Sequence, residues 1–420
     1  MSVPDTGIAP IAAPPPVRRR IPRWWWAVGL VAVLALLSLL EVLTDANDLA
    51  SSGTIRATLI ATTPILLAAL GGLWSERAGV VNIGLEGMMI LGTFGAAWWA
   101  YEYGAWVGVL GAILFGALGG ALHGVATVIF GVDHIVSGVA INILALGVTR
   151  YLAPLAFEGH AGGSAKQSPA IDSLGSFTVP GLSDGLRDLN NQGWFFISDI
   201  AGLLGGLVTN VSWLTLIAIA LIPGTWWILW RTAFGLRLRS CGENPVAAES
   251  LGVNVYLHKY VAVVISGAFA GMGGASLVLL RGGADYLENQ TNGRGYIGLA
   301  AMIFGNWRPG GLLGGAALFG YADGLQLAGG GEAVLALLYG AVILVGVIVV
   351  VQLFRRQWIA AGLGVVGAGV LYAIYWANDT LPSDLIPYTA HFVTLIVLAV
   401  ASQRLRPPKA DGQPYRRGED

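Results

Sequence analysis

Charged residues are scarce in this sequence. Of its 420 residues, 11% are Asp, Glu, Lys or Arg, whereas 55% are hydrophobic. A typical soluble domain carries about 25% charged residues, so most of the surface of this chain cannot face water. The formal net charge of −1 offers no attraction to the phosphates of nucleic acid, and we expect no nucleic-acid partner.

Cysteine, metal-binding patterns and phosphate-binding loops are also missing. Cys241 is the single cysteine, which excludes an internal disulfide. The five histidines lack the spacing of metal ligands, so no metal site is expected. The motif G-x-x-x-x-G-K-[ST], which binds the phosphates of ATP, does not occur, and neither does H-E-x-x-H. The sequence therefore predicts no catalytic residues, no enzymatic activity and no cofactor in this chain.

Long apolar runs fill the chain instead. A transmembrane helix needs about 20 mostly apolar residues. Runs that meet or approach this length lie at about 24–43, 56–73, 83–100, 105–130, 135–156, 211–230, 259–280, 311–328, 333–353, 358–376 and 388–403. A shorter run at 295–305 is interpreted as a half-span. These runs predict an all-α polytopic membrane protein with about 10–12 transmembrane helices in contact with lipid.

Positive charge sets the predicted orientation of the spans. With the N-terminus inside and 295–305 counted as a crossing, 17 of the 23 Lys and Arg residues lie on the inner side. This distribution predicts a protein of the plasma (inner) membrane with both termini in the cytoplasm. Residues 157–198 would form an extracytoplasmic loop, and 231–258 a cytoplasmic loop.

The two ends of the chain have the composition of polar extensions. Residues 1–23 are rich in Pro and Ala and carry four arginines before the first span. They are expected to be a disordered cytosolic leader. Residues 404–420 are expected to be a cytosolic tail.

Small residues recur at a spacing that suits close helix packing. Gly116, Gly120 and Gly124 repeat every four residues, as do Gly267 and Gly271. Small residues at this spacing let helix backbones approach each other closely in lipid. Close packing is therefore predicted, with gating hinges as the alternative.

Two short stretches of the chain are similar to each other. NIGLEGMMI (82–90) is similar to YIGLAAMIF (296–304), and the predicted topology has them enter from opposite sides. Inverted repeats are common in transporters, whose substrate path lies between the two halves. The alternative is a chance similarity between two apolar helices.

Polar side chains inside the predicted spans are candidates for a substrate path, because such groups are costly in lipid. The candidates are Asn82, Glu86, Asn142, Asp323 and Gln326. The alternative is structural: the amides would link helices by hydrogen bonds worth about 1 kcal/mol each, and Glu86 would be solvated or paired with Arg77. No chain of acids suited to ion coupling is visible, and the scarcity of buried charge favours a neutral polar solute.

The stretch CGENPVAAESLGVN (241–254) interrupts the apolar runs with a short, well-delimited helix. Asn244 is a good N-cap, Pro245 suits the first helical position and Gly252 suits the end. Only about seven helical residues fit between them, about 10 Å of helix. Such a helix is not stable alone, so it is predicted to pack against another body.

Several separated motifs resemble those of one transporter family. They are WSERAGVVNIGLEGMMILGTFGA (74–96), DHIVSGVAINILALGVTRYL (133–152), CGENPVAAESLGVNV (241–255) and GRGYIGLAAMIFGNWRPGG (293–311). They are similar to ABC importer permeases of the branched-chain amino acid and ribose permease superfamily, and within it to the simple-sugar or nucleoside type. The similarity covers about 55–330 and resumes at about 382–417.

The resemblance implies that the short helix is a coupling helix, which docks into a groove of an ATPase subunit. The family motif covers Gly242, Glu243, Asn244, Pro245, Ala247, Ala248, Gly252 and Val253. Three protein partners are implied: the ATPase, which would hold ATP and Mg²⁺, a second homologous permease in a heterodimer, and an extracytoplasmic substrate-binding lipoprotein.

The function implied is that of the transmembrane permease subunit of an ATP-driven ABC importer. Its solute would be a neutral polar molecule, a nucleoside or a simple sugar. The alternatives are an ion-coupled secondary transporter of a small solute, a membrane-embedded enzyme and a structural membrane subunit.

One region departs from the family pattern. Two additional spans at 333–376 separate the segment LFGYADGLQL from PYTAHFVTL, which follow each other closely in the family. The predicted organisation is therefore a transmembrane permease domain at 24–403 that contains a two-span insertion.

Overall fold

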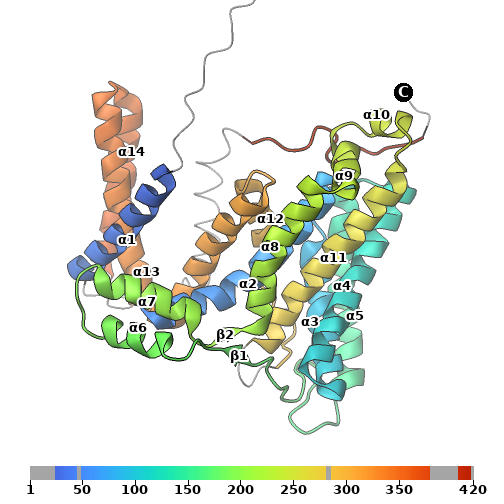
Figure 1. Cartoon of the computed structure of the whole chain (residues 1–420), viewed down its shortest axis with the longest axis horizontal. Helices are drawn as coiled ribbons and strands as arrows, with labels where there is room; N and C mark the ends of the chain where they lie inside the picture. Colours follow the sequence, from blue (N-terminus) through green and yellow to red (C-terminus); the bar gives the residue numbers. More distant parts are fainter. Residues whose placement is uncertain (1–23, 45–48, 281–284, 379–404, 418–420) are drawn as a thin grey trace, which may run out of the picture.

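The computed structural model describes residues 24–44, 49–280, 285–378 and 405–417. The expected leader at 1–23, the expected span at 388–403 and residues 418–420 of the expected tail lie outside these ranges. Within them the chain is almost entirely helical (Figure 1). The elements are α1 (Trp24–Thr44), α2 (Ser52–Arg77), α3 (Leu85–Tyr103), α4 (Ala105–Gly124), the π-helical η1 (Val125–Ile129), α5 (His134–Phe157), β1 (Ser176–Phe177), α6 (Leu182–Asn190), α7 (Ile197–Val208), β2 (Val211–Ser212), α8 (Trp213–Arg231), α9 (Ala233–Glu243), α10 (Pro245–Ser250), α11 (Val255–Leu279), α12 (Arg294–Phe304), α13 (Pro309–Phe354) and α14 (Trp358–Ala377).

These helices confirm an all-α polytopic membrane protein. Among the described residues, seven helical segments are long and apolar enough to cross a membrane. They are Ser52–Arg77, Ala105–Ile129, His134–Phe157, Trp213–Arg231, Val255–Leu279, Glu332–Phe354 and Trp358–Ala377. The run at 295–305 forms α12, whose 11 residues extend over about 16 Å. That length is about half of the hydrocarbon core of a bilayer, as expected of a half-span.

The runs at 311–328 and 333–353 do not form two helices, contrary to the sequence prediction. The chain is helical without interruption from Pro309 to Phe354, over 46 residues. Three glycines at 329–331 disfavour helix by about 1 kcal/mol each. Apolar sequence lies on both sides of them, and in such surroundings backbone groups are satisfied by continued helical hydrogen bonds.

The last part of α13 pairs with α14 outside the main bundle, and α1 lies beside this pair (Figure 1). The rings of Tyr339 and Tyr375 lie 4.9 Å apart between α13 and α14. Gly340 lies against the side chain of Leu40 in α1. Only 6% of the apolar window of α14 and 28% of that of Glu332–Phe354 are buried, so this pair, which corresponds to the predicted insertion at 333–376, leaves most of its apolar surface uncovered by the described residues.

Helix α2 is the centre of the main bundle. Its apolar window is 83% buried, and α8, α11, α12 and α13 pack around it. A helix that is apolar on all sides is stable only in such a position. The segment Ile65–Leu70 has no side chain more than 2% exposed.

Helices α4 and α11 pack backbone against backbone, as the glycine spacing predicted. A Cβ atom on Gly116 would lie 2.3 Å from the carbonyl oxygen of Gly267, and one on Gly271 would lie 2.1 Å from that of Ala112. Cβ atoms do not approach carbonyl oxygens so closely. Glycine is therefore required at this crossing.

The two ends of the bundle differ. At one end, called the α6 end, β1 pairs antiparallel with β2, with Phe177 opposite Val211, and α6 and α7 lie beside them (Figure 1). Helix α7 was not predicted from the sequence. The opposite end, called the α10 end, carries α9, α10 and residues 405–417.

The α4–α11 crossing gives a prediction for stability. We expect Gly271→Val to lower the free energy of unfolding by about 1–3 kcal/mol or more, because the added atoms overpack the crossing. The measurement is thermal unfolding of the purified protein in detergent. The control is Gly367→Val on α14, where a Cβ has nothing within 4 Å; equal losses in both variants would contradict the prediction.

Candidate functional site

The predicted short helix at the α10 end is present as α10. The side-chain oxygen of Asn244 accepts a hydrogen bond from the amide of Ala247 at 3.0 Å, and Pro245 occupies the first helical position. Gly252 has φ +83°, a left-handed conformation that ends a helix at little cost only for glycine. The amide of Val253 then donates to the carbonyl of Ala248 at 3.0 Å.

One side of α10 is packed and the other is open. Ala248 is 2% exposed and lies in an apolar cluster with Cys241 and Val255. Leu251 is 85% exposed and Val246 46% exposed. The open side therefore presents apolar side chains at a surface that the described residues leave uncovered.

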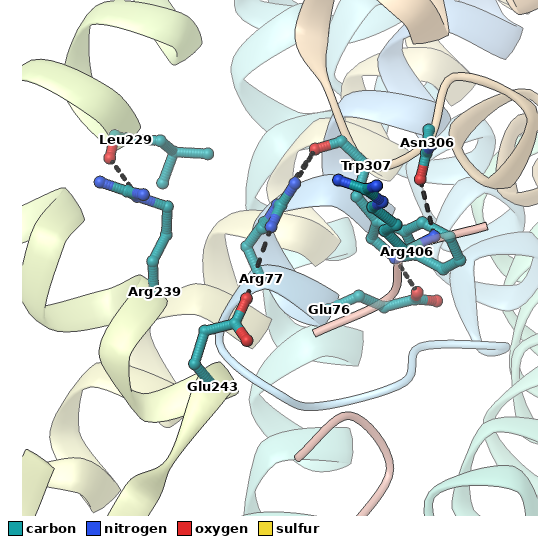
Figure 2. Close-up of polar contacts among 8 residues, drawn as sticks. All are labelled: Glu76, Arg77, Leu229, Arg239, Glu243, Asn306, Trp307 and Arg406. Carbon is teal, nitrogen blue, oxygen red and sulfur yellow. Dashed lines mark hydrogen bonds and ion pairs between the residues drawn. The ribbon is translucent and has the colours of Figure 1, made fainter. Parts of the chain in front are cut away.

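The end of α9 lies directly on the end of α2. A Cβ on Gly242 would lie 2.3 Å from the carbonyl oxygen of Arg77, so the two backbones are in contact. The guanidinium of Arg77 donates two hydrogen bonds to the carbonyl of Trp307, at 3.0 and 2.6 Å, and lies 4.0 Å from the carboxylate of Glu243 (Figure 2). The indole of Trp307 donates to Glu76 at 2.6 Å. The α10 segment is thus joined to the ends of α2 and α12.

Inside the bundle, Glu86 holds the N-terminus of the half-helix α12. Its carboxylate accepts hydrogen bonds from the hydroxyl of Thr291 at 2.6 Å and from the amides of Gly293 at 2.9 Å and Gly295 at 2.7 Å. The side chain is buried. A carboxylate is favoured at a helix N-terminus, where the helix dipole is positive. Arg77 bonds elsewhere, so the structure does not show the pairing of Glu86 with Arg77, or its solvation, that the sequence left open.

Asn142 holds the N-terminus of α3, as Glu86 holds that of α12. Its side-chain oxygen accepts from the amide of Gly87 at 2.7 Å. Its amide nitrogen donates to the carbonyl of Ile83 at 3.1 Å and to the hydroxyl of Tyr296 at 2.8 Å. The similar stretches 82–90 and 296–304 therefore meet at their helix N-termini. They run in opposite directions, because α3 leads away from Arg77 whereas α12 ends next to it.

Asn82 lies close to this junction. Its amide nitrogen donates to the hydroxyl of Ser266 at 2.9 Å, while its buried side-chain oxygen has no hydrogen-bond partner among the described residues. Asn82, Glu86 and Asn142 therefore come together around the start of α3, as a candidate path requires.

Asp323 forms a separate ion pair with Arg294, the first residue of α12. Their closest atoms are 2.7 Å apart, and each side chain is 14% exposed. This contact was not predicted from the sequence. An acid inside a span requires a cationic partner, and Arg294 stands two positions before the repeated motif, so the signal was present. The side chain of Gln326 lies outside the described part of the chain.

The arrangement leaves little charge for a solute. Glu86 is satisfied by amides and a hydroxyl, and Asp323 by Arg294. Arg150 pairs with Glu288 near the α6 end. Near the junction, the side chain of Tyr296 is an uncharged polar group that is 46% exposed, whereas the charged side chains of Arg294 and Asp323 are each 14% exposed and paired with each other.

Residues GLSDG (181–185) match the motif G-x-S-x-G, which carries the catalytic serine in many hydrolases. In a nucleophile elbow the serine of this motif stands on a sharp turn between a strand and a helix. Here Ser183 lies within α6, and its neighbour Asp184 pairs with Arg187. Within the described ranges no hydrogen bond joins Ser183 to a histidine, and the strand-to-helix turn of a nucleophile elbow is not formed at this serine.

Two groups at the α10 end have displaced pKa values. Burial raises the pKa of the Cys241 thiol to about 11, with the charge of Lys259 acting in the opposite direction. Burial also raises the pKa of Asp411 to about 6, while its hydrogen bond with Glu76 and the charges of Lys259 and Arg77 lower it in part. Cys241 is therefore a thiol, and an unreactive one, at neutral pH.

The junction at Glu86 gives the next prediction. We expect Glu86→Ala to lower the free energy of unfolding by about 2–4 kcal/mol, because two amides and a hydroxyl lose their acceptor in a buried place. Glu86→Gln keeps one acceptor oxygen and should lose about half as much. Thermal unfolding in detergent measures both, against Glu102→Ala at an exposed position of α3. A wild-type midpoint for Glu86→Ala would contradict the assignment.

Asp411 gives a prediction of pH dependence. Because its pKa is raised in the folded state, its contribution to stability is complete below the ordinary aspartate pKa of about 3.9 and is lost as the pH rises through about 6. We expect the protein to be about 1 kcal/mol more stable at about pH 5.5 than at about pH 8 from this group. Asp411→Asn should remove that difference in thermal unfolding; the same pH response in both proteins would disprove it.

Comparison with known proteins shows the family. Residues 54–351 match the family model described as "Branched-chain amino acid transport system / permease component". The guanosine ABC transporter permease protein NupQ of Bacillus subtilis is 41% identical over 285 residues, which cover 66% of this chain and 82% of the relative. The nucleoside ABC transporter permease protein NupC of Lactococcus lactis is 36% identical over 279 residues, 65% of this chain and 81% of the relative.

Further relatives include a permease named for a sugar and a second one named for guanosine. The putative glucose ABC transporter permease protein TsgC13 of Haloferax volcanii is 34% identical over 278 residues, 66% of this chain and 78% of the relative. A second guanosine permease protein of Bacillus subtilis, NupP, is 27% identical over 251 residues, 58% of this chain and 65% of the relative. No solved structure matches the chain. With its family match, its helical bundle and its α10 segment, this chain belongs to the family of ABC importer permeases, as a membrane-spanning permease component.

Proposed function

We propose that this permease carries a nucleoside across the plasma membrane. The observation that carries the proposal is the Glu86–Asn142 junction, where Glu86 is hydrogen-bonded from within the chain and the exposed side chain of Tyr296 is uncharged. A neutral polar solute suits such surroundings. Two relatives that are 41% and 36% identical bear the names of guanosine and nucleoside permeases.

A simple sugar is the second candidate solute. It is favoured by the relative named as a putative glucose permease, at 34% identity. Sugars and nucleosides share hydroxyl groups, but only nucleosides carry an aromatic base. The exposed ring of Tyr296 offers such a base a stacking surface.

The partners follow from the same proposal. The open face of α10, with Leu251 and Val246, takes the groove of an ATPase subunit that binds ATP and Mg²⁺, which places the α10 end in the cytoplasm. A second, related permease completes the path as a heterodimer, which is supported by the match to both NupQ and NupP. A substrate-binding lipoprotein delivers the solute at the α6 end.

In the proposed mechanism, α10 receives the movement of the ATPase and transmits it to the membrane-spanning helices. Closure of the ATPases on ATP displaces α10, and the contacts of Gly242 with Arg77 and of Arg77 with Trp307 carry this displacement to α2 and α12. The other end of α12 is the Glu86 junction. The permease thereby alternates between outward-facing and inward-facing states without hydrolysing ATP itself.

Co-purification tests the docking assignment. The chain is expressed with its ATPase and with the second permease, and recovery of the ATPase is measured. We expect Leu251→Arg to lower recovery by about tenfold or more, because a charge is buried against an apolar partner surface. The control is Phe354→Arg, which alters a residue with a similar exposure of 86% at the distant end of α13.

The outcomes are distinct. Equal recovery with Leu251→Arg would exclude α10 as the docking helix. An ATPase that is never recovered with the wild type would exclude the ATP-driven importer and favour an ion-coupled transporter.

Uptake in cells tests the solute. We expect saturable uptake of labelled guanosine that excess unlabelled nucleosides inhibit at least tenfold and that excess glucose leaves unchanged. Inhibition by glucose alone would favour the sugar alternative. The path assignment is checked with Tyr296→Leu, which removes the aromatic ring and should raise the KM for the nucleoside about tenfold, since base–aromatic stacking is worth about 1–3 kcal/mol.

A further inference from the structure

Residues 405–417, called the C-terminal strap, cross the α10 end of the bundle (Figure 1). The strap begins beside the turn between α12 and α13, where the amide of Arg406 donates to the side-chain oxygen of Asn306 at 2.8 Å. In its middle, the amide of Ala410 donates to the carbonyl of Gly242 at 2.9 Å. Near its end it reaches α10. The strap thus contacts both ends of the route by which α10 is joined to α12.

The middle of the strap is closely packed. Ala410 is 5% exposed. Gly79 has φ +82°, and a Cβ there would lie 3.0 Å from the Cα of Gly242 and 3.1 Å from the carbonyl oxygen of Ala410. The chain after α2, the end of α9 and the strap therefore meet backbone to backbone. Side chains do not separate these segments, so displacement of one presses directly on the others.

The end of the strap fixes the orientation of α10. Glu249, whose side chain is 29% exposed, accepts a hydrogen bond from the hydroxyl of Tyr415. Its other oxygen lies 2.7 Å from the guanidinium of Arg417. The ring of Tyr415 also packs on that of Tyr256 in α11, with centroids 5.5 Å apart. Tyr415 therefore links α10 to α11.

Helix α10 needs such support. It has six residues, and an isolated helix of this length is unstable. Asn244 and Gly252, at its two ends, have backbone conformations outside the helical region. Without a second attachment, a push on the open face would turn α10 about these ends and leave α2 and α12 in place.

We propose that the C-terminal strap is the tether that holds α10 rigidly to the bundle and transmits its displacement to α2 and α12. This inference rests on the proposed function, because it takes α10 as the helix that the ATPase moves. It assigns a positioning role to Tyr415, Arg417 and Glu249, whose contacts leave Leu251 of the docking face 85% exposed.

The test uses the full complex reconstituted in proteoliposomes, with guanosine as the solute. Two quantities are measured: recovery of the ATPase, and the amount of guanosine moved per ATP hydrolysed. For Tyr415→Ala/Arg417→Ala we expect full recovery of the ATPase, because Leu251, the most exposed apolar side chain of the docking face, is unchanged. Guanosine moved per ATP should fall about 2- to 30-fold, the range that residues on a coupling route produce. Arg356→Ala, in the turn between α13 and α14, is the matched control for removal of an arginine.

Cys241 reports on the position of the strap in the same samples. It is 0% exposed, and Tyr415 packs on its cluster. As the single cysteine of the chain, it gives an unambiguous labelling signal for this subunit. We expect a maleimide to label wild-type Cys241 slowly and the double variant at least tenfold faster, at an unchanged thermal unfolding midpoint within about 2–4 °C, which corresponds to about 1 kcal/mol.

Exchanging the charges of Glu249 and Arg417 distinguishes the loss of their ion pair from a general loss of structure. Glu249→Arg and Arg417→Glu should each lower guanosine moved per ATP by about two- to fivefold, the effect of a partly exposed ion pair. Combined in one chain they should restore at least half of the wild-type ratio, which a general loss of structure would not do.

The outcomes that would overturn the proposal are specific. It fails if the double variant keeps the wild-type ratio of guanosine to ATP while Cys241 becomes labelled. It fails equally if the variant no longer recovers the ATPase, because the strap would then be part of the docking surface. Failure of the wild type to recover the ATPase would instead refute the proposed function.

Discussion

The hydrogen bonds of Glu86 are the contact on which the interior of this bundle depends. A helix that begins inside a membrane exposes amide groups that no water can satisfy. Helix α12 begins in this way, and the carboxylate of Glu86 accepts two of these amides together with the hydroxyl of Thr291. The half-helix, the ion pair of Arg294 with Asp323 and the position of Tyr296 follow from where that N-terminus is held.

The same constraint is met a second time with different chemistry. At the start of α3 the side chain of Asn142, and not a carboxylate, accepts the amide of Gly87. The N-terminus of α3 is thus held by the neutral amide of Asn142, whereas that of α12 is held by the carboxylate of Glu86. The two similar stretches therefore run in opposite directions but differ in the chemistry that holds their N-termini.

Much of the fold was predictable because the membrane limits the choices of a backbone. Apolar runs gave the helices close to their observed bounds, and the caps at Asn244 and Gly252 defined α10, because both signals are local. The continuity of α13 was not predictable, since it depends on how the surroundings of three glycines satisfy the backbone. Helix α7 was missed because its 12 residues are short and interrupted by glycines.

The candidate site was predictable in its residue types but not in its pairings. Asn82, Glu86, Asn142 and Asp323 were found because polar groups are rare in the spans. The partners of Glu86 were not, because Thr291, Gly293 and Gly295 come from a segment more than 200 residues away from it in sequence. Only the folded chain shows that Glu86 acts on a helix end and that Arg77 bonds to Trp307.

The contact between Arg406 and Asn306 has a consequence for how such a chain can grow. Both residues lie at the α10 end, so the roughly hundred residues between them must leave that end and return to it. Whatever crosses the membrane in between must do so an even number of times. Transmembrane spans can therefore be inserted into this part of the protein only in pairs. A single extra span would put the last segment of the chain on the opposite side of the bilayer from α10.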